Sequence, residues 1–178
     1  MLRDAALRDV RDMLEIYRPY ILETAYTFEY DVPSLEEFEA RFRKITGAFP
    51  WLVWEESGEI LGYAYGSRAF ERAAYQWDAD LSIYLRRDCR GRGVGRQLYT
   101  ELERRLQAQG YYVLYGLVTS ANTGSCAFHE AMGYRAAMRL PSCGFKFGQW
   151  YDIIWYEKRL RDGNPAQSPI SWAQASLL

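Results

Sequence analysis

Residues 90–95 read Arg-Gly-Arg-Gly-Val-Gly, with glycines at alternate positions. Glycine has no Cβ, so the backbone can pass close to an anion, and successive N–H groups and the start of a following helix point positive partial charge at it. Within residues 86–96 there are five arginines against one acid, Asp88, although the chain carries a formal net charge of -1. The positive charge is therefore local, and the loop predicts a site for a compact polyanion.

Three common kinds of glycine-rich segment do not match this loop. A Walker loop needs Gly-Lys-Ser/Thr after the glycines, and a dinucleotide fingerprint fails because Arg96 and Leu98 stand where a third glycine would lie. An RNA-binding arginine–glycine tract is normally low-complexity, whereas this loop lies between a strand-like run and a helix-like segment. A pyrophosphate site of another kind and an ordinary surface turn remain as interpretations.

His129 is the single histidine of the chain and follows Asn122 by seven residues. Two helical turns separate the two positions, so both side chains are expected on one face of a helix. Histidine titrates near neutral pH and can donate or accept a proton. A structural hydrogen bond for His129 and a helix N-cap for Asn122 are the alternatives.

The first half of the chain predicts two helices followed by three strands. Apolar residues at helical spacing over residues 7–17 indicate a helix that Pro19 disturbs near its end. Ser34 and Glu37 have capping-box spacing, which starts a second helix that ends near Gly47. Three aromatic-rich or apolar runs then predict strands, the first two as a hairpin and the third leading into the glycine loop: residues 51–56, 60–68 and 80–85.

The second half predicts two helices and three strands. Apolar residues recur every four positions from Val94 to Leu106, and Gly110 stands where a left-handed cap would end this helix. The nearly continuous apolar run 111–119 is typical of a strand buried on both faces. A short helix over 123–132, strands over 134–140 and 151–160, and a loosely held tail over 161–178 complete the prediction.

Composition limits the class of protein. A chain of 178 residues with 49% apolar content can bury the core of one ordinary domain. Its near-zero net charge gives no general attraction for nucleic acid or an anionic membrane. Three cysteines without a Cys-x-x-Cys pair, no metal-ligand cluster, no apolar signal core and no run of roughly 18 to 20 apolar residues predict a cytoplasmic protein without a metal.

Together these features resemble the GNAT superfamily of N-acetyltransferases. The family signature Arg/Gln-x-x-Gly-x-Gly/Ala is matched by Arg90-x-x-Gly93-x-Gly95. The resemblance implies one α/β (α+β) domain over residues 1–160, with a mixed, mostly antiparallel sheet of six to seven strands flanked by about four helices. It also implies acetyl-CoA as cosubstrate, held by the pantetheine-side residues Ile83, Tyr84, Leu85 and Asn122 and by the pyrophosphate loop Arg90, Gly91, Arg92, Gly93, Val94, Gly95 and Arg96.

Further runs resemble the phosphinothricin and methionine-sulfoximine acetyltransferase branch. They are Pro50-Trp51-Leu52-Val53, Tyr75-x-Trp77, Ser82–Leu85, His129–Tyr134 and Gly144-Phe145-Lys146-x-Gly148-x-Trp150-x-Asp152. Members of this branch acetylate the α-amino group of small amino-acid analogues and usually work as homodimers. The resemblance therefore implies a small-molecule amine substrate, direct attack in a ternary complex, and a homodimer.

The same branch suggests roles for individual side chains. Asp80 matches a glutamate that serves as base; because aspartate is one methylene shorter, direct proton abstraction needs a closer amine than relay through one water. A solvated strand-end carboxylate is the alternative for Asp80. His129 would assist proton transfer or position the substrate, and Phe28, Arg72 and Tyr75 would bind the acceptor, with the arginine gripping a carboxylate. In the run Gly148-Gln149-Trp150, Gln149 stands where this branch usually has arginine.

Two other functions remain open from the sequence. An acetyltransferase for a peptide or protein N-terminus would need an open, acidic groove instead of an aromatic pocket. A CoA-binding module without catalysis would keep the loop and lose the proton chemistry. Nucleic-acid binding is disfavoured, because the arginines occupy one loop with no flanking aromatic platform.

Overall fold

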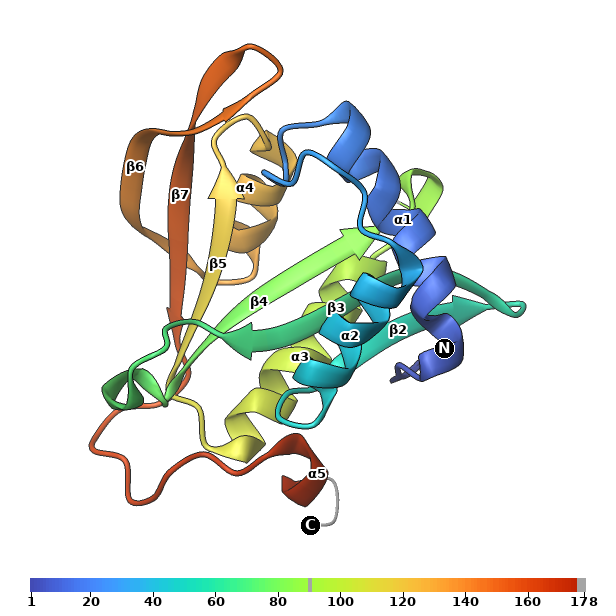
Figure 1. Ribbon diagram of the computed structural model, residues 1–178. Helices are drawn as coiled ribbons and strands as arrows, with labels where there is room; N and C mark the ends of the chain where they lie inside the picture. Colours follow the sequence, from blue (N-terminus) through green and yellow to red (C-terminus); the bar gives the residue numbers. More distant parts are fainter. Residues whose placement is uncertain (90, 176–178) are drawn as a thin grey trace.

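The computed structural model describes residues 1–89 and 91–175 (Figure 1). Seven strands of these residues form one sheet in the order β1-β2-β3-β4-β5-β7-β6, in which β4 and β5 are parallel and the other neighbours are antiparallel. The strands are β1 (Leu2–Asp4), β2 (Trp51–Glu56), β3 (Glu59–Arg68), β4 (Asp78–Leu85), β5 (Val113–Thr119), β6 (Arg135–Lys146) and β7 (Gln149–Arg159). The predicted mixed, mostly antiparallel sheet is confirmed.

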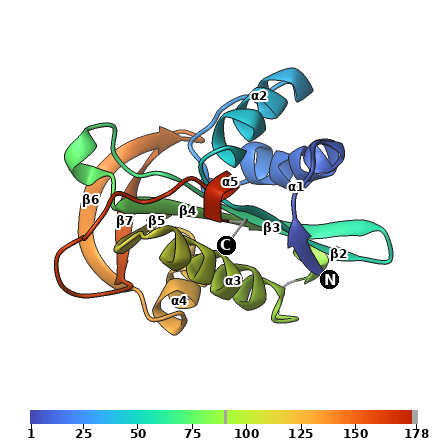
Figure 2. The same ribbon diagram turned by 90° about the horizontal axis from the view of Figure 1, so that it is seen from below.

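Helices cover both faces of the sheet, as Figure 2 shows. One face carries α1 (Val10–Glu23) and α2 (Leu35–Thr46), and the other carries α3 (Val94–Gln109) and α4 (Thr123–Ala131). A short helix, α5 (Trp172–Ala175), lies near the end of the described chain, and three-residue 3-10 turns occupy Leu7–Asp9, Ala73–Tyr75 and Arg87–Cys89. The sheet therefore has a separate apolar core on each side.

The two cores arise from the apolar spacing of the helices. On the α3 side, Leu98, Leu102 and Leu106 are fully buried in a cluster that includes strand residues Leu81 and Leu114. On the α1 and α2 side, the buried cluster is rich in aromatic residues, among them Tyr17, Phe38, Phe42, Trp51 and Tyr63. Alternation along each strand sends successive side chains to the two cores.

Two elements continue past a proline, and the second runs further than the sequence predicts. Pro19 lies inside α1, which continues to Glu23, because Ile21 is fully buried and Tyr20 is anchored to the main chain of Leu85. The strand predicted to end at Leu140 extends as β6 to Lys146. It passes Pro141 through a register shift between Leu140 and Gly144, where Ser142 has φ 47°. An edge strand tolerates such a bulge.

The pairing of β4 with β5 is short and decides where the site lies. It covers three residue pairs, from Asp78 with Val113 to Asp80 with Tyr115. Beyond this point the two strands separate, as Figure 1 shows, while β4 stays paired with β3 as far as Leu85. Polar main-chain groups on the open side of β4 are therefore free to face a ligand.

The tail after Arg161 contacts the domain at several points. The main-chain N–H of Trp172 donates to the carbonyl of Ala48 at 3.0 Å, and Gln109 Nε2 donates to the carbonyls of Ala48 (2.8 Å) and Ile170 (2.9 Å). The Arg105 guanidinium lies 4.8 Å from the centre of the Trp172 ring. The structure thus gives this segment specific contacts; its expected looseness stays a prediction.

Candidate active site

A cavity of about 680 Å³ opens where β4 and β5 separate. Its walls come from the end of β4, the glycine loop, the start of α4 and the end of α1, so four separate elements meet there. The lining residues are Tyr20, Tyr26, Ile83, Leu85, Cys89, Gly91, Gly93, Val94, Gly95, Arg96, Asn122, Thr123, Gly124, Ser125 and Phe128. The structure brings together most of the residues predicted to bind acetyl-CoA.

The glycine loop has the backbone that an anion site needs. Gly91 and Gly93 have φ 78° and 79°, a left-handed conformation that side chains other than glycine rarely adopt. Gly93 is the N-cap of α3 and has no side-chain cap, so N–H groups of the first turn remain available at the cavity. At Gly95 a Cβ would already lie 3.3 Å from Leu85 Cδ1. This loop fits a pyrophosphate at a helix N-terminus.

The arginines near the loop contribute less positive charge than their number suggests. Arg92 Nη2 lies 2.6 Å from Glu56 Oε2, and its side chain is not among the described residues of the cavity wall. Arg86 pairs with Glu59 and Asp88, and Arg87 pairs with Glu23. Arg96 lines the cavity, and Arg90 lies outside the described residues. The anion site therefore depends mainly on the backbone.

The β4 residues divide between the two faces of the sheet. Ile83 and Leu85 line the cavity, whereas the Tyr84 ring packs on the α1 side, 4.6 Å from the centre of Tyr17 and 5.4 Å from that of Tyr63. The Tyr84 side chain therefore does not reach the cavity, and its predicted pantetheine contact stays a prediction. Tyr20 adds a contact that spacing alone did not reveal: its hydroxyl donates to the Leu85 carbonyl at 2.7 Å.

Asn122 and His129 do not share one environment. Asn122 lines the cavity and also caps α4, because its Oδ1 accepts the Ser125 N–H at 3.2 Å. His129 is 3% exposed: its Nδ1 bonds to the Ser125 carbonyl at 2.8 Å, and its Nε2 lies 3.0 Å from the Tyr99 hydroxyl. The ring stacks on Tyr156 and is not among the described residues of the cavity wall.

The surroundings of His129 determine its protonation. Burial lowers the pKa of the imidazole, and the hydrogen bond to the Ser125 carbonyl opposes this only in part. Gly116 on β5 makes room for the ring, since a Cβ there would lie 2.4 Å from His129 Nε2. A neutral histidine with both nitrogens engaged matches the structural alternative better than proton exchange with a substrate. Its predicted part in proton transfer stays a prediction.

Asp80 occupies the last paired position of β4 with β5, opposite Ser67 on β3 and Tyr115 on β5. Its neighbours Ala79 and Leu81 are buried in the α3-side core, so alternation turns Asp80 toward the α1 side. Burial raises the pKa of Asp80 to about 7, against the opposing effect of the Leu81 N–H. Its Oδ1 is buried and accepts no hydrogen bond from any described residue.

These features give Asp80 the properties of a base at neutral pH. A carboxylate whose pKa is near the working pH is ionised in a useful fraction and still binds a proton. Asp80 is three residues, roughly 10 Å, from Ile83 along the strand. Its side chain points to the opposite face of the sheet from Ile83, and it is not among the described residues of the cavity wall. Burial together with an unpartnered oxygen is typical of a functional carboxylate.

The three predicted acceptor residues come from two places. The Phe28 ring lies in the α1–α2 loop, against Gly144 of β6 and 6.5 Å from the centre of the Tyr151 ring. Arg72 and Tyr75 lie in the exposed connection between β3 and β4, where Tyr75 packs on Phe70 with ring centres 4.7 Å apart. Their binding roles stay predictions.

A group of aromatic residues next to Asp80 was missed by the sequence reasoning. The Phe70 ring stacks on Trp155 of β7, with centres 5.6 Å apart, and meets the edge of Tyr115 at 5.8 Å. Tyr115 is the register partner of Asp80, so this cluster adjoins the candidate base. Its members lie on three separate segments at no common spacing, and no sequence pattern links them.

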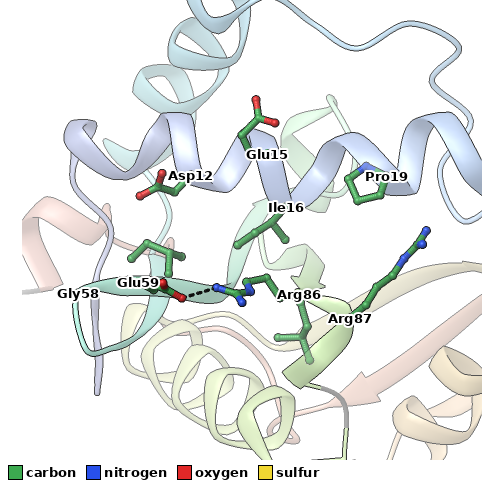
Figure 3. Close-up of a pocket in the computed structure, with 10 residues that line it drawn as sticks. Asp12, Glu15, Ile16, Pro19, Gly58, Glu59, Arg86 and Arg87 are labelled. Atoms are coloured by element: carbon green, nitrogen blue, oxygen red, sulfur yellow. Dashed lines mark hydrogen bonds and ion pairs between the residues drawn. The ribbon is translucent and has the colours of Figure 1, made fainter.

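A second cavity, of about 510 Å³, lies between α1, the β2–β3 turn and the end of β4 (Figure 3). Figure 3 shows one pair within its lining, Arg86 with Glu59, whereas Arg87 pairs with Glu23 outside the lining. It contains neither Asp80 nor the glycine loop among its described lining residues. This cavity is separate from the candidate active site.

No helix within residues 1–89 and 91–175 is long and apolar enough to cross a membrane. In the same part of the chain, no three histidine, cysteine, aspartate or glutamate side chains are grouped to hold a metal ion.

Comparison with known proteins identifies this arrangement of loop, sheet and cavity. Residues 2–155 match the family described as acetyltransferase (GNAT) domain. The chain belongs to the GNAT acetyltransferase family. A phosphinothricin N-acetyltransferase from Alcaligenes faecalis is 35% identical over 158 residues, 88% of this chain and 80% of that protein. An L-methionine sulfoximine/L-methionine sulfone acetyltransferase from Pseudomonas paraeruginosa is 34% identical over 89% of this chain and 94% of its own length.

A solved GNAT structure carries the ligand that the cavity predicts. The crystal structure of a phosphinothricin acetyltransferase from Sinorhizobium meliloti in complex with acetyl-CoA has a TM-score of 0.89 and 36% identity to this chain, covering 94% of it and 92% of the other. The family match and these relatives make this protein an acetyl-CoA-dependent GNAT N-acetyltransferase. The predicted fold and enzyme class are confirmed.

Proposed function

We propose that this GNAT enzyme transfers the acetyl group of acetyl-CoA to the primary amine of a small amino acid or analogue of the phosphinothricin or methionine-sulfoximine kind. Transfer occurs by direct attack within a ternary complex. The observation that carries the proposal is Asp80, a half-buried residue placed where β4 and β5 part, whose Oδ1 is buried and whose pKa is raised by this burial to about 7. The acceptors named for the relatives support the same substrate class.

The residues of the large cavity fit acetyl-CoA, which supplies the activated acetyl group. The main-chain N–H groups of residues 91–96 would hold its pyrophosphate, since Gly91 and Gly93 adopt left-handed conformations beside the N-terminus of α3. Ile83 and Leu85 offer an apolar wall for the pantetheine arm, and Asn122 offers its amide. The open strand edge is available at Ile83, because both main-chain groups of Leu85 bond to the Tyr20 hydroxyl.

Asp80 prepares the acceptor by removing a proton. The amino group of an amino acid is mostly protonated at neutral pH and cannot attack a carbonyl carbon in that form. The ionised Asp80 carboxylate takes this proton, directly or through one ordered water, and the neutral amine becomes the nucleophile. Burial disfavours the charged carboxylate, so taking up a proton also relieves its desolvation cost.

His129 acts on this reaction by position in our proposal. Its ring ties Ser125 of α4 to Tyr99 of α3, and Ser125 lines the cavity. Holding the start of α4 keeps Asn122 and Ser125 at the cavity wall. Phe28, Arg72 and Tyr75 bind the acceptor, with Arg72 available for a carboxylate group because it is exposed beside Tyr75.

We further propose that the enzyme is a homodimer of the cytoplasm. Large apolar side chains are exposed on β6, on the β6–β7 turn and at the start of β7, and a concentration of this kind is typical of an interface. They are Met138, Leu140, Phe145, Phe147 and Trp150. Sedimentation of the purified protein tests the dimer, and Leu140→Glu is expected to shift it toward monomer.

Release of free thiol from acetyl-CoA across a panel of amines tests the activity. With methionine sulfoximine or phosphinothricin as acceptor, thiol release is expected to be much faster than with a peptide that has a free N-terminus. Saturation by a peptide at lower concentration than by any amino acid would instead support an N-terminal acetyltransferase. Binding of CoA without turnover of any amine would support a non-catalytic module.

A further inference from the structure

The side chain of Lys146 is buried but takes no part in the proposed chemistry. It projects from the end of β6, and the residue is 2% exposed. Its Nζ donates to the main-chain carbonyls of Ile21 at 2.7 Å and Thr27 at 2.8 Å, and it lies 5.1 Å from the centre of the Phe147 ring. No carboxylate of the described residues forms an ion pair with it. The ammonium is therefore held by main-chain oxygens.

The Ile21 carbonyl explains why a positive charge is buried here. Ile21 lies in the last turn of α1, where carbonyls lack helical partners and the helix dipole is negative. α1 has no basic residue of its own in that turn, so Lys146 supplies the cation from a strand distant in sequence. An ammonium that loses such partners would be buried without compensation, which is costly. The contact therefore ties the α1 end firmly to β6.

The second carbonyl belongs to a loop that reaches both parts of the active site. Thr27 stands between Tyr26, which lines the acetyl-CoA cavity, and Phe28, the predicted acceptor contact. Its hydroxyl also lies 2.7 Å from the hydroxyl of Tyr17 on α1. Thr27 is thus fixed from α1 through its side chain and from β6 through its carbonyl.

The β6–β7 hairpin, which carries Lys146, contacts the α1–α2 loop at two more points. Gly144 accommodates the Phe28 ring, since a Cβ there would lie 2.1 Å from Phe28 Cε2. The Tyr30 hydroxyl donates to the carbonyl of Phe145. Three successive β6 residues, Gly144, Phe145 and Lys146, therefore set the place of residues 27–30.

We propose that Lys146 is a positioning residue that fixes the α1–α2 loop, so that Tyr26 faces acetyl-CoA and Phe28 faces the acceptor amine. The role of Lys146 in placing Phe28 rests on the proposed function. Its role in placing Tyr26 rests only on the cavity that Tyr26 lines. It makes the β6–β7 hairpin part of the substrate-binding apparatus, although Lys146 itself contacts neither substrate.

Steady-state kinetics of Lys146→Met test the proposal. We expect the KM for the amine to rise at least tenfold and the KM for acetyl-CoA about threefold, while kcat changes less than threefold. Amide hydrogen exchange in residues 22–31 is expected to become at least tenfold faster. KM values within twofold of wild type, with unchanged exchange in this segment, would overturn it.

Two controls separate positioning from general loss of stability. Lys158→Met removes a partly buried lysine that donates to the Met132 carbonyl at 2.8 Å and also pairs with Glu103. It is expected to lower the melting temperature without changing either KM more than twofold. Gly144→Ala displaces Phe28 and leaves Lys146 in place, so it is expected to raise the amine KM alone. Gly47→Ala, where a Cβ meets nothing within 4 Å, is its matched control.

Two further measures keep the result decisive. If Lys146→Met does not fold, Lys146→Gln takes its place, because glutamine keeps N–H donors without the charge. For this variant we expect the amine KM to rise at least threefold. If the wild-type enzyme acetylates no amine, the proposed function fails, and calorimetric binding of acetyl-CoA together with exchange in residues 22–31 still decides the role of Lys146. Equal acetyl-CoA affinity and equal exchange in wild type and variant would then refute it.

Discussion

The acetyl-CoA half and the acceptor half of this site are built from different materials. The first, as proposed, depends mainly on main-chain groups of one continuous segment, residues 91–96, in which Gly91 and Gly93 are left-handed. The second, as proposed, depends on side chains from β4, the α1–α2 loop and the β6–β7 hairpin, and on the burial of Asp80 and Lys146. A backbone site is damaged by conformational strain, whereas a side-chain site is damaged by loss of one charge or contact. Variants can therefore affect one half and spare the other.

The largest effect is expected from Asp80→Asn. Without a base the amine stays protonated, so kcat/KM should fall about 100-fold or more, while acetyl-CoA affinity measured by calorimetry stays within twofold. In wild type, kcat/KM should rise with pH through an inflection near 7, where Asp80 ionises, and the variant should lack this inflection. Asp78→Asn, two residues earlier on β4, is the control. Full activity in Asp80→Asn would place the base elsewhere.

Substitution of His129 tests whether it acts by position or by proton transfer. Removing the ring leaves a cavity among Tyr99, Phe128 and Tyr156 and an unpaired Tyr99 hydroxyl, so His129→Ala should lower the free energy of unfolding by about 3 kcal/mol in a urea titration. Well below the melting temperature, kcat should change less than about threefold, because 100-fold losses belong to proton transfer. A 100-fold loss of kcat with little loss of stability would make His129 a proton donor.

The stability of Asp80→Asn should also depend on pH. Folded Asp80 keeps its proton up to about pH 7, against an ordinary pKa of 3.8. Between these values the folded state binds more protons than the unfolded chain, so wild-type stability falls as pH rises. The variant avoids this loss, so its free energy of unfolding at pH 8 should exceed that of wild type by about 2 kcal/mol. The pKa difference allows at most about 4 kcal/mol. At pH 4 the two proteins should be equally stable. Equal stabilisation at both pH values would contradict a buried, titrating carboxyl.

The smallest effect in this series concerns the backbone half. Gly93→Val puts a β-branched residue at φ 79°, which costs about 1–3 kcal/mol of strain, and should weaken acetyl-CoA binding about tenfold with the amine KM unchanged. Gly58→Val imposes similar strain at φ 83° in the β2–β3 turn. It should lower stability and leave acetyl-CoA binding intact. If both variants bind acetyl-CoA equally well, the loop does not depend on its left-handed glycine.

Much of the fold follows from local patterns. The capping box at Ser34 starts α2, Gly110 ends α3 in a left-handed cap, and the hairpin around Gly58 joins β2 and β3. Each of these signals operates within a few residues, where side-chain chemistry dictates the backbone. The patterns ended one strand at Leu140, whereas β6 continues past Pro141, because an edge-strand bulge compensates for the missing N–H group there.

The sequence by itself determined the anion loop, since Gly91 and Gly93 directly before a helix permit the left-handed backbone that an anion site uses. Only the tertiary structure decided which charged and polar groups near the site are paired or buried. Arg92 pairs with Glu56, and His129 is buried among aromatic side chains. Asp80 is shielded from solvent beside Tyr115. Lys146, which is 119 residues from Thr27 along the chain, belongs to the same group. Conformational preference is local, whereas desolvation and pairing depend on which distant segments the fold brings together.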